Sequence, residues 1–144
     1  MSSISTDQPL AAGTPERPGS PIVLVVDDDV DVGETVATNL RRAGLRVRTA
    51  LNADYALDFC KTQPFDAVVL DHHPGDTYSE NVLGEAPDVG LAVIISTAPP
   101  SQLADIRSRH AEKVFAVKTK PVAPPDLVEV VQAAVTASRR QQNR

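Results

Sequence analysis

Short, uninterrupted apolar runs limit what this chain can fold into. They are Ile22–Val26, Ala67–Leu70 and Leu91–Ile95, and each is followed at once by polar residues. Runs of this length are typical of strands buried on both faces, which occur mainly in parallel sheets covered by helices. Tryptophan is absent and aromatic residues make up only 3% of the chain, so the core must consist mainly of Val, Leu, Ile and Ala.

The segments around these runs predict further strands and helices in alternation. Leu45–Ala50 and Val114–Val117 complete a set of five predicted strands. Five helices are predicted between and after these strands. The first ends near Gly44 and has the apolar stripe Val32, Val36 and Leu40, and the second runs from the N-cap Asn52 to about Gln63. A short third helix is predicted near Ser79–Glu85, a fourth from Pro99-Pro100-Ser101 to about His110, and a fifth from Pro125 or Asp126. This alternation predicts an α/β domain with a doubly wound, five-stranded parallel sheet flanked by helices.

The length of 144 residues fits one domain with short tails. Residues 1–20 are rich in Pro, Gly and Ser and predict a disordered leader, residues 21–137 form the domain, and residues 138–144 are expected to be a polar tail. The net charge of -5 argues against nucleic-acid binding. The single cysteine, Cys60, excludes an internal disulfide. Since neither a secretory signal nor a membrane span is evident, we expect a cytoplasmic protein.

Polar side chains stand where the predicted strands end. Asp27 and Asp28 follow the first strand, Asp71 follows the third, Ser96-Thr97 follow the fourth, and Lys120 comes three residues after the fifth. In open α/β sheets, ligands bind beyond the carboxyl ends of the strands, so these groups should converge. Crowded carboxylates repel one another, and a hard cation such as Mg²⁺, which takes oxygen ligands, relieves that repulsion.

These segments resemble a known family. Val23-Leu24-Val25-Val26-Asp27-Asp28-Asp29, Asp66-Ala67-Val68-Val69-Leu70-Asp71, Val93-Ile94-Ile95-Ser96 and Lys120-Pro121 are similar to the motifs of CheY-like receiver domains, the signalling domains of two-component response regulators. The resemblance covers about residues 21–137 and keeps the motifs in order. It implies a flavodoxin-like sheet with the strand order 2-1-3-4-5.

The resemblance also implies a phosphorylation site with Mg²⁺. Asp71 matches the aspartate that accepts the phosphoryl group, and Asp27 and Asp28 match the acidic pair that positions the metal. The backbone carbonyl of His73 falls where the family supplies another metal ligand. A carboxylate is a competent nucleophile for forming an acyl phosphate, which makes this role chemically reasonable.

Other positions match residues that stabilise the phosphoryl group. Lys120 matches the lysine that neutralises its charge, and the following Pro121 favours Lys120 over Lys118 and implies a cis peptide bond. Ser96 matches the hydroxyl that contacts the phosphoryl group, because it ends the apolar run; Thr97 is the second choice.

The function implied is that of a stand-alone receiver rather than a dedicated enzyme. Its partners would be a histidine kinase or a histidine phosphotransfer protein, which donates the phosphoryl group, and a downstream protein that binds the phosphorylated form. A homodimer through the fourth helix, fifth strand and fifth helix is also implied. Neither nucleic acid nor membrane is expected among the partners.

The sequence departs from the family beside the phosphoacceptor. The segment His72-His73-Pro74 replaces the usual pattern and the stretch to Ser96 is short, so the third helix should be abbreviated. Val117 stands where many receivers have a switch aromatic, and the nearby aromatic is Phe115. These departures favour an alternative function, an interaction module that keeps the fold and works without phosphorylation.

Two further alternatives concern the residues after Asp71. His72 and His73 suggest a transition-metal site, but adjacent side chains on an extended segment point apart and rarely share one ion. A hydrolase of the haloacid type also has an aspartate nucleophile at a strand end. It needs a second acid two residues later, where this chain has His73.

Overall fold

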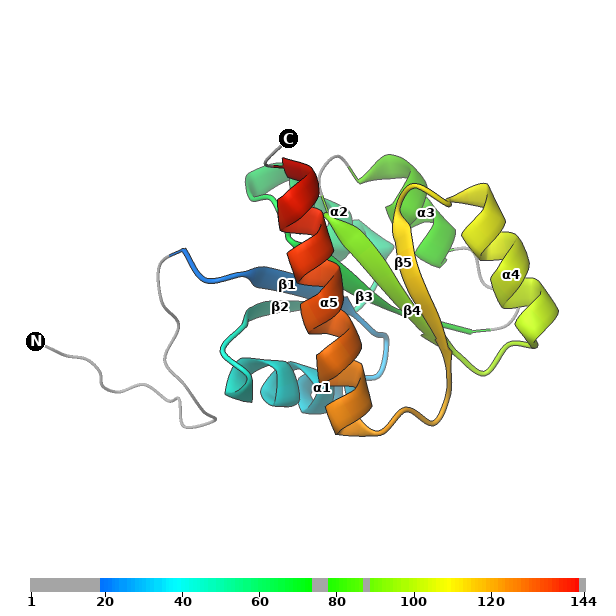
Figure 1. Cartoon of the computed structure of the whole chain (residues 1–144), viewed down its shortest axis with the longest axis horizontal. Coiled ribbons are helices and arrows are strands. Elements are labelled where there is room, and N and C mark those ends of the chain that lie inside the picture. Colours follow the sequence, from blue (N-terminus) through cyan, green and yellow to red (C-terminus); the bar gives the residue numbers. More distant parts are fainter. Residues whose placement is uncertain (1–18, 74–77, 87–88, 143–144) are drawn as a thin grey trace, which may run out of the picture.

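A computed structural model describes residues 19–73, 78–86 and 89–142 of the chain (Figure 1). The strands in these ranges are β1 (Ile22–Val26), β2 (Arg46–Ala50), β3 (Ala67–His72), β4 (Leu91–Ser96) and β5 (Val114–Thr119). The helices are α1 (Val30–Arg42), α2 (Ala53–Thr62), α3 (Tyr78–Glu85), α4 (Pro100–Arg109) and α5 (Pro124–Gln142). None of these helices is long and apolar enough to span a membrane.

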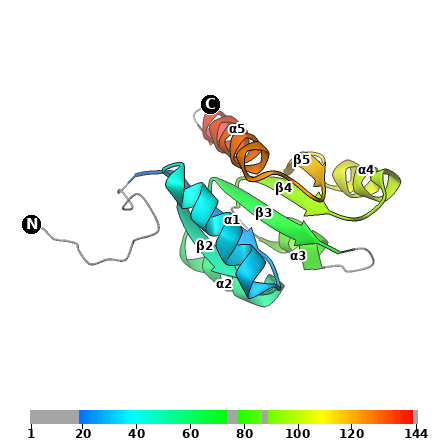
Figure 2. The ribbon, with the colours of Figure 1, turned by 90° about the horizontal axis from the view of Figure 1, so that it is seen from below.

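The strands form one parallel sheet in the order β2-β1-β3-β4-β5. The predicted fold class and strand order are therefore confirmed. The predicted short third helix is also confirmed, since α3 has eight residues. Figure 2 shows helices on both sides of the sheet, with α5 on one side and α3 on the other.

Each face of the sheet has its own apolar core. Helices α1 and α5 pack against one face, which includes Val25, Val69 and Val93. Helices α2, α3 and α4 pack against the opposite face, which includes Leu70 and Ile94. Every residue of β1, β3 and β4 is buried, whereas the edge strands β2 and β5 are partly exposed. This is the burial that uninterrupted apolar runs predict for central parallel strands.

Local contacts explain where several elements begin. The side chain of Asn52 accepts a hydrogen bond from the Tyr55 backbone N–H at 2.9 Å, so Asn52 caps α2 as the sequence predicts. Gly90 has a φ of +66° just before β4, and a β-carbon there would collide with the Asp66 carbonyl. Only glycine fits this approach, which fixes the start of β4 against the chain leading into β3.

Helix α1 buries a different set of residues from the predicted stripe. Val32 is 41% exposed and Val36 is only partly buried, whereas Gly33, Ala37 and Leu40 are buried. The helix is confirmed, but of the predicted stripe only Leu40 is fully buried. The small residues Gly33 and Ala37 thus lie on the face of α1 that is turned to the core, and the two valines lie beside it.

The helix α5 extends beyond the predicted end of the domain. It continues to Gln142, so the predicted polar tail from Ser138 is helical over most of its length. Ser138 is buried, and Arg139 reaches the Asp66 carboxylate, with Nε 3.1 Å from Oδ1. Residues 1–18 of the predicted leader lie outside the described ranges.

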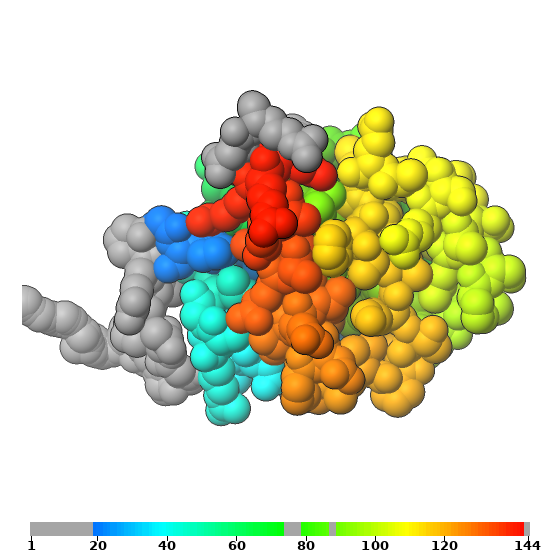
Figure 3. Space-filling model, viewed as in Figure 1, coloured from blue at the N-terminus to red at the C-terminus, as the bar shows by residue number. Residues whose placement is uncertain are grey.

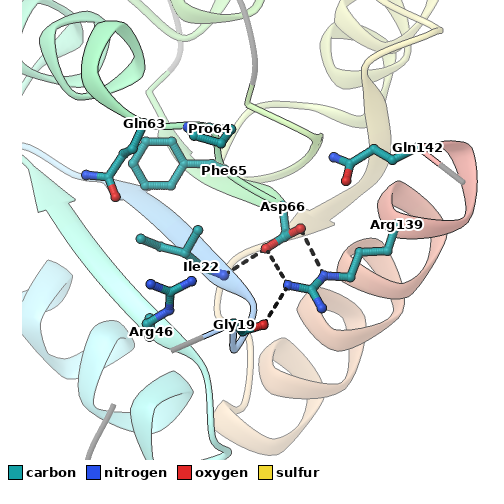
Figure 4. Close-up of a pocket in the computed structure, with 9 residues that line it drawn as sticks. All are labelled: Gly19, Ile22, Arg46, Gln63, Pro64, Phe65, Asp66, Arg139 and Gln142. Atoms are coloured by element: carbon teal, nitrogen blue, oxygen red, sulfur yellow. Dashed lines mark hydrogen bonds and ion pairs between the residues drawn. The ribbon is translucent and has the colours of Figure 1, made fainter. Parts of the chain in front are cut away.

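Arg139 and Asp66 stand at the amino-terminal edge of the sheet (Figure 4). The Ile22 backbone N–H donates to Asp66 Oδ2 at 2.9 Å, and the Arg139 guanidinium also donates to the Gly19 carbonyl at 3.2 Å. A pocket of about 450 Å³ adjoins these residues. It lies at the opposite edge of the sheet from the polar residues that the sequence singles out, and its contacts are structural: they join α5 to the beginnings of β1 and β3.

Candidate functional site

The carboxyl ends of β1, β3 and β5 bring an acidic pocket together. Asp27 directly follows β1, Asp71 lies within β3, and Lys120 directly follows β5. The Lys120 ammonium group forms an ion pair with Asp71 Oδ1, and the backbone N–H of Lys120 donates to the Ser96 carbonyl at 2.9 Å. Asp27 and Asp71 stand at the ends of the neighbouring strands β1 and β3, whereas Lys120 follows β5, which β4 separates from β3. Residues far apart in the chain therefore meet because the carboxyl ends of parallel strands lie at one edge of the sheet.

Asp71 is a deeply placed carboxylate with both oxygens in contact with a cationic or hydrogen-bonding group. Its side chain is 3% exposed, and Oδ2 lies 3.0 Å from His73 Nε2 while Oδ1 pairs with Lys120. A buried charge without partners is very costly, so Lys120 and His73 explain how an ionised carboxylate is tolerated here.

Asp27 stands beside Asp71 and is also buried. Its Oδ1 accepts a hydrogen bond from the Asp29 backbone N–H at 2.9 Å. The pKa of Asp27 is raised to about 6. Burial is the largest cause and the charge of Asp71 acts in the same direction, while the Asp29 hydrogen bond and the Lys120 charge offset part of the shift. The raised pKa reflects the cost of burying a negative charge beside a second carboxylate, and a cation bound between the two carboxylates would lower this cost.

The three carboxylates of this site are donors that suit Mg²⁺. Asp27, Asp28 and Asp71 provide hard carboxylate oxygens, and the exposed Asp28 side chain keeps the pocket open to water, which Mg²⁺ retains as ligand. Their combined negative charge exceeds the single positive charge of Lys120. Further positive charge at this edge of the sheet would therefore be stabilised.

The His73 ring contacts two of the carboxylates of this site. Its Nε2 atom lies 3.2 Å from Asp28 Oδ1 as well as 3.0 Å from Asp71 Oδ2. The hydrogen bond to Asp28 raises the pKa of His73, and the charges of Asp71 and Asp28 add to this shift. The sequence predicts only the backbone carbonyl of His73 as part of the site, so the ring contact is an addition from the structure.

His72 points away from the pocket, as the alternation of a strand requires. It is 1% exposed, and its Nδ1 lies 2.9 Å from Ser96 Oγ. The strand β3 therefore includes His72, one residue beyond the expected end at Asp71. The expectation that His72 and His73 point apart is confirmed.

The predicted hydroxyl Ser96 lies on the wrong face for contact with Asp71. Asp71 pairs with Ile95 across the sheet, whereas His72 pairs with Ser96. Neighbouring residues in a parallel register share a face, and successive residues alternate between faces. The Ser96 hydroxyl is fully buried and accepts a hydrogen bond from the Ala98 backbone N–H at 2.9 Å.

Thr97 is the second hydroxyl considered from the sequence. It follows Ser96 by one residue and is exposed, so the same alternation, continued one residue beyond β4, would direct it to the Asp71 face. The alternation of residues between the two faces of a strand can be counted in the sequence. It shows which hydroxyl shares a face with Asp71 only when the register between β3 and β4 is known.

Two details near Lys120 agree with the sequence analysis. The peptide bond between Lys120 and Pro121 is cis, as expected. Lys118, the competing lysine, is an exposed residue of β5, whereas Lys120 reaches Asp71.

Comparison with known proteins gives one similar curated sequence. The response regulator receiver protein Anae109_2439 of Anaeromyxobacter sp. (strain Fw109-5) is 32% identical over 109 residues, which are 74% of this chain and 45% of that protein. The chain thus spans about half the length of this relative. No protein-family model matches the sequence.

Solved structures with the same fold are numerous. A CheY-like receiver domain protein from Methanospirillum hungatei JF-1 superposes with a TM-score of 0.74 at 19% identity, over 85% of this chain and 99% of that one. A response regulator protein from Burkholderia pseudomallei, solved with a phosphorylated aspartic acid, a calcium ion and citrate, gives a TM-score of 0.67 at 20% identity, over 85% and 73% of the two chains. At these identities the likeness concerns the fold.

Proposed function

Since this chain contains a receiver domain of the response regulator family, we propose that Asp71 accepts a phosphoryl group with the help of Mg²⁺. The observation that carries the proposal is the ion pair between Lys120 and the buried carboxylate of Asp71, with Asp27 beside it. Phosphoryl transfer depends on positioning and charge stabilisation, and this pocket provides both.

The metal would be held by the carboxylates of Asp27, Asp28 and Asp71 and by the backbone carbonyl of His73. Bound Mg²⁺ supplies positive charge next to the phosphoryl oxygens. Asp27 is held in place by the Asp29 backbone N–H, so its carboxylate needs little reorganisation to bind a cation. The calcium ion and phosphorylated aspartic acid in the Burkholderia pseudomallei protein are consistent with such chemistry on this fold.

Lys120 and Thr97 would stabilise the transferred group. The Lys120 ammonium already lies at Asp71 Oδ1 and can turn to an oxygen of a phosphoryl group attached there. Thr97 is exposed and directly follows Ser96, which pairs with His72, so alternation supports a position on the Asp71 face. We therefore propose the Thr97 hydroxyl, in place of that of Ser96, as the hydrogen-bond donor to the phosphoryl group.

The donor would be a phosphohistidine of a histidine kinase or a phosphotransfer protein. One Asp71 oxygen attacks phosphorus, the bond from phosphorus to the imidazole nitrogen breaks, and that nitrogen keeps the electron pair. When the other ring nitrogen of the phosphohistidine carries a proton, the products are an acyl phosphate on Asp71 and a neutral histidine on the donor. Two-component signalling is thus the proposed role, and the domain is a phosphoacceptor rather than a dedicated enzyme.

The phosphorylated form would act through the surface of α4, β5 and α5. Figure 3 shows these elements side by side on one face of the molecule. Phe115 is an extra residue in the register of β5 with β4 and packs with the α5 side of the core, while Val117 packs with the α4 side. Because no aromatic residue occupies position 117, we propose that any switch runs through the loop after β4 and through α4, which a downstream protein or a second copy would read.

The test is incubation with Mg²⁺ and a small acyl phosphate, followed by intact-mass analysis. We expect the wild type to gain one phosphoryl group and the Asp71→Asn variant to gain none. The exposed Asp58→Asn variant controls for adventitious labelling and should behave like the wild type. No gain in the wild type, under conditions that label a control receiver, would refute the proposal, and a gain that persists in Asp71→Asn would place the site elsewhere.

A second candidate is the interaction module that works without phosphorylation. It is favoured by the contact of His73 with both Asp28 and Asp71, because the ring already supplies a hydrogen-bonding group where a metal would bind. The two candidates differ in their effect on partner binding. An Asp71→Asn variant that still binds every partner of the phosphodonor-treated wild type, with equal affinity, would favour the interaction module.

A further inference from the structure

We propose that the metal site of this chain prefers divalent transition-metal ions to Mg²⁺, with the His73 imidazole as a ligand beside Asp28 and Asp71. The inference rests on the metal site of the proposed function and names the class of ion that fits it best. It concerns the ring of His73, whereas the site deduced from the sequence uses only the backbone carbonyl of this residue.

The geometry places three donor atoms around one position. One ring nitrogen of His73 and one carboxylate oxygen each of Asp28 and Asp71 lie within 4.8 Å of one another. His73 Nε2 is 3.2 Å from Asp28 Oδ1 and 3.0 Å from Asp71 Oδ2. An ion between these atoms needs only small side-chain shifts to reach bonding distances.

Lys120 does not occupy the position between Asp71 Oδ2, Asp28 and His73. Lys120 pairs with Oδ1, and His73 faces Oδ2, so an ion at Oδ2 does not have to displace the lysine. Asp28 and His73 are about half exposed or more, which gives an ion a path from solvent. The remaining coordination positions would be filled by water.

The chemistry of the donors decides which ions bind well. Mg²⁺ takes oxygen ligands and gains little from imidazole, whereas Co²⁺, Ni²⁺ and Zn²⁺ bind imidazole and carboxylate together. For Mg²⁺ the His73 ring is an obstacle that must leave the carboxylates. For a transition-metal ion the same ring is a ligand that is already in place.

The second histidine does not take part. His72 Nδ1 contacts Ser96 Oγ on the opposite face of the sheet, and the ring is buried there. The transition-metal site that two adjacent histidines suggest in the sequence is therefore not a pair of imidazoles. It is one imidazole with two carboxylates from the ends of β1 and β3.

The first test measures Co²⁺ and Mg²⁺ binding to the full chain by calorimetry, without any phosphodonor. We expect His73→Gln to weaken Co²⁺ binding by at least about tenfold, the lower range for loss of a partner at a metal site, and to leave Mg²⁺ binding unchanged or stronger. His110→Gln, which changes a histidine far from the pocket, should bind both ions like the wild type. Equal weakening of Co²⁺ and Mg²⁺ in His73→Gln would overturn the proposal, because it would indicate loss of pocket structure.

The second test detects the bond itself. A histidine on Co²⁺ gives a strongly shifted ring N–H proton in the paramagnetic NMR spectrum, and we expect this signal in the wild type and in His110→Gln but not in His73→Gln. Its absence from the wild type would overturn the proposal and leave His73 as a hydrogen-bond donor only. Because neither test uses phosphorylation, an unlabelled Asp71 with a shifted histidine signal would refute only the proposed function, and a labelled Asp71 without that signal would refute only this inference.

Discussion

The hydroxyl groups of Ser96 and Thr97 allow a direct separation of structural from functional roles. Ser96→Ala removes an acceptor that lies 2.9 Å from the Ala98 backbone N–H and 2.9 Å from His72 Nδ1. Both partners are 1% exposed, so water cannot replace the hydroxyl. One orphaned buried polar group costs roughly 1–3 kcal/mol, and with two at stake we expect a loss of about 2–3 kcal/mol in the free energy of unfolding.

Thr97→Val should slow labelling and leave the stability nearly unchanged. Thr97 is exposed, so its loss should change the free energy of unfolding by no more than about 0.5 kcal/mol. A positioned donor to developing charge commonly contributes a large factor in rate, and we expect labelling by the acyl phosphate to slow by at least about tenfold. Thr97→Ser keeps the hydroxyl and should label at nearly the wild-type rate.

The assays are urea denaturation followed by circular dichroism and the time course of the mass gain. Ser101→Ala, a change at an exposed serine of α4, is the control for both. The assignment would be refuted if Ser96→Ala kept wild-type stability while losing the label, and Thr97→Val labelled normally. That result would mean that Ser96 turns to the Asp71 face, against the register of β3 with β4.

Two further predictions concern contacts outside the pocket. Arg139→Ala removes the guanidinium from the buried Asp66 carboxylate, which keeps the hydrogen bond from the Ile22 N–H, and should lower the free energy of unfolding by about 1–3 kcal/mol in urea denaturation. The variant Arg140→Ala, at an exposed neighbouring residue, should change it little, and equal effects of the two variants would contradict a specific role of Arg139. The hydrogen bond from Arg109 lowers the pKa of Glu80, so Glu80 stabilises the fold above its unfolded-state pKa, and this contribution is lost as the pH falls through the lower folded-state pKa. Thermal denaturation should therefore show Glu80→Gln less stable than the wild type at neutral pH and equal to it in strong acid, and a gap that persists in acid would argue against the ionic origin.

The strands were predictable because their signal is local. The runs Ile22–Val26, Ala67–Leu70 and Leu91–Ile95 in β1, β3 and β4 are apolar without interruption, because strands that are buried on both faces need apolar side chains at successive positions. The polar residues at their ends could then be placed at one edge of the sheet by topology alone. For this reason the meeting of Asp27, Asp71 and Lys120 follows from the sequence without any side-chain detail.

The end of α5 was not predictable in this way. Ser138 and Arg139 are polar, and composition assigns such residues to a frayed tail. Their burial and pairing depend on Asp66, which is 73 residues from Arg139 in the chain. A partner so distant leaves no trace in a local pattern, and the same holds for the small residues Gly33 and Ala37 that α1 buries in place of Val32.

The directions of the His72 and His73 side chains depend on where β3 ends. A strand that ended at Asp71 would leave His72 and His73 as two residues of a loop with no defined directions. Because β3 continues through His72, the pleat sends His72 into the core toward Ser96 and turns His73 toward Asp28. The same alternation that removes Ser96 from the pocket thus places an imidazole in it. The orientation of Ser96 follows from its place in β4, and that of His73 follows from the continuation of β3, so both follow from the alternation of residues in paired parallel strands.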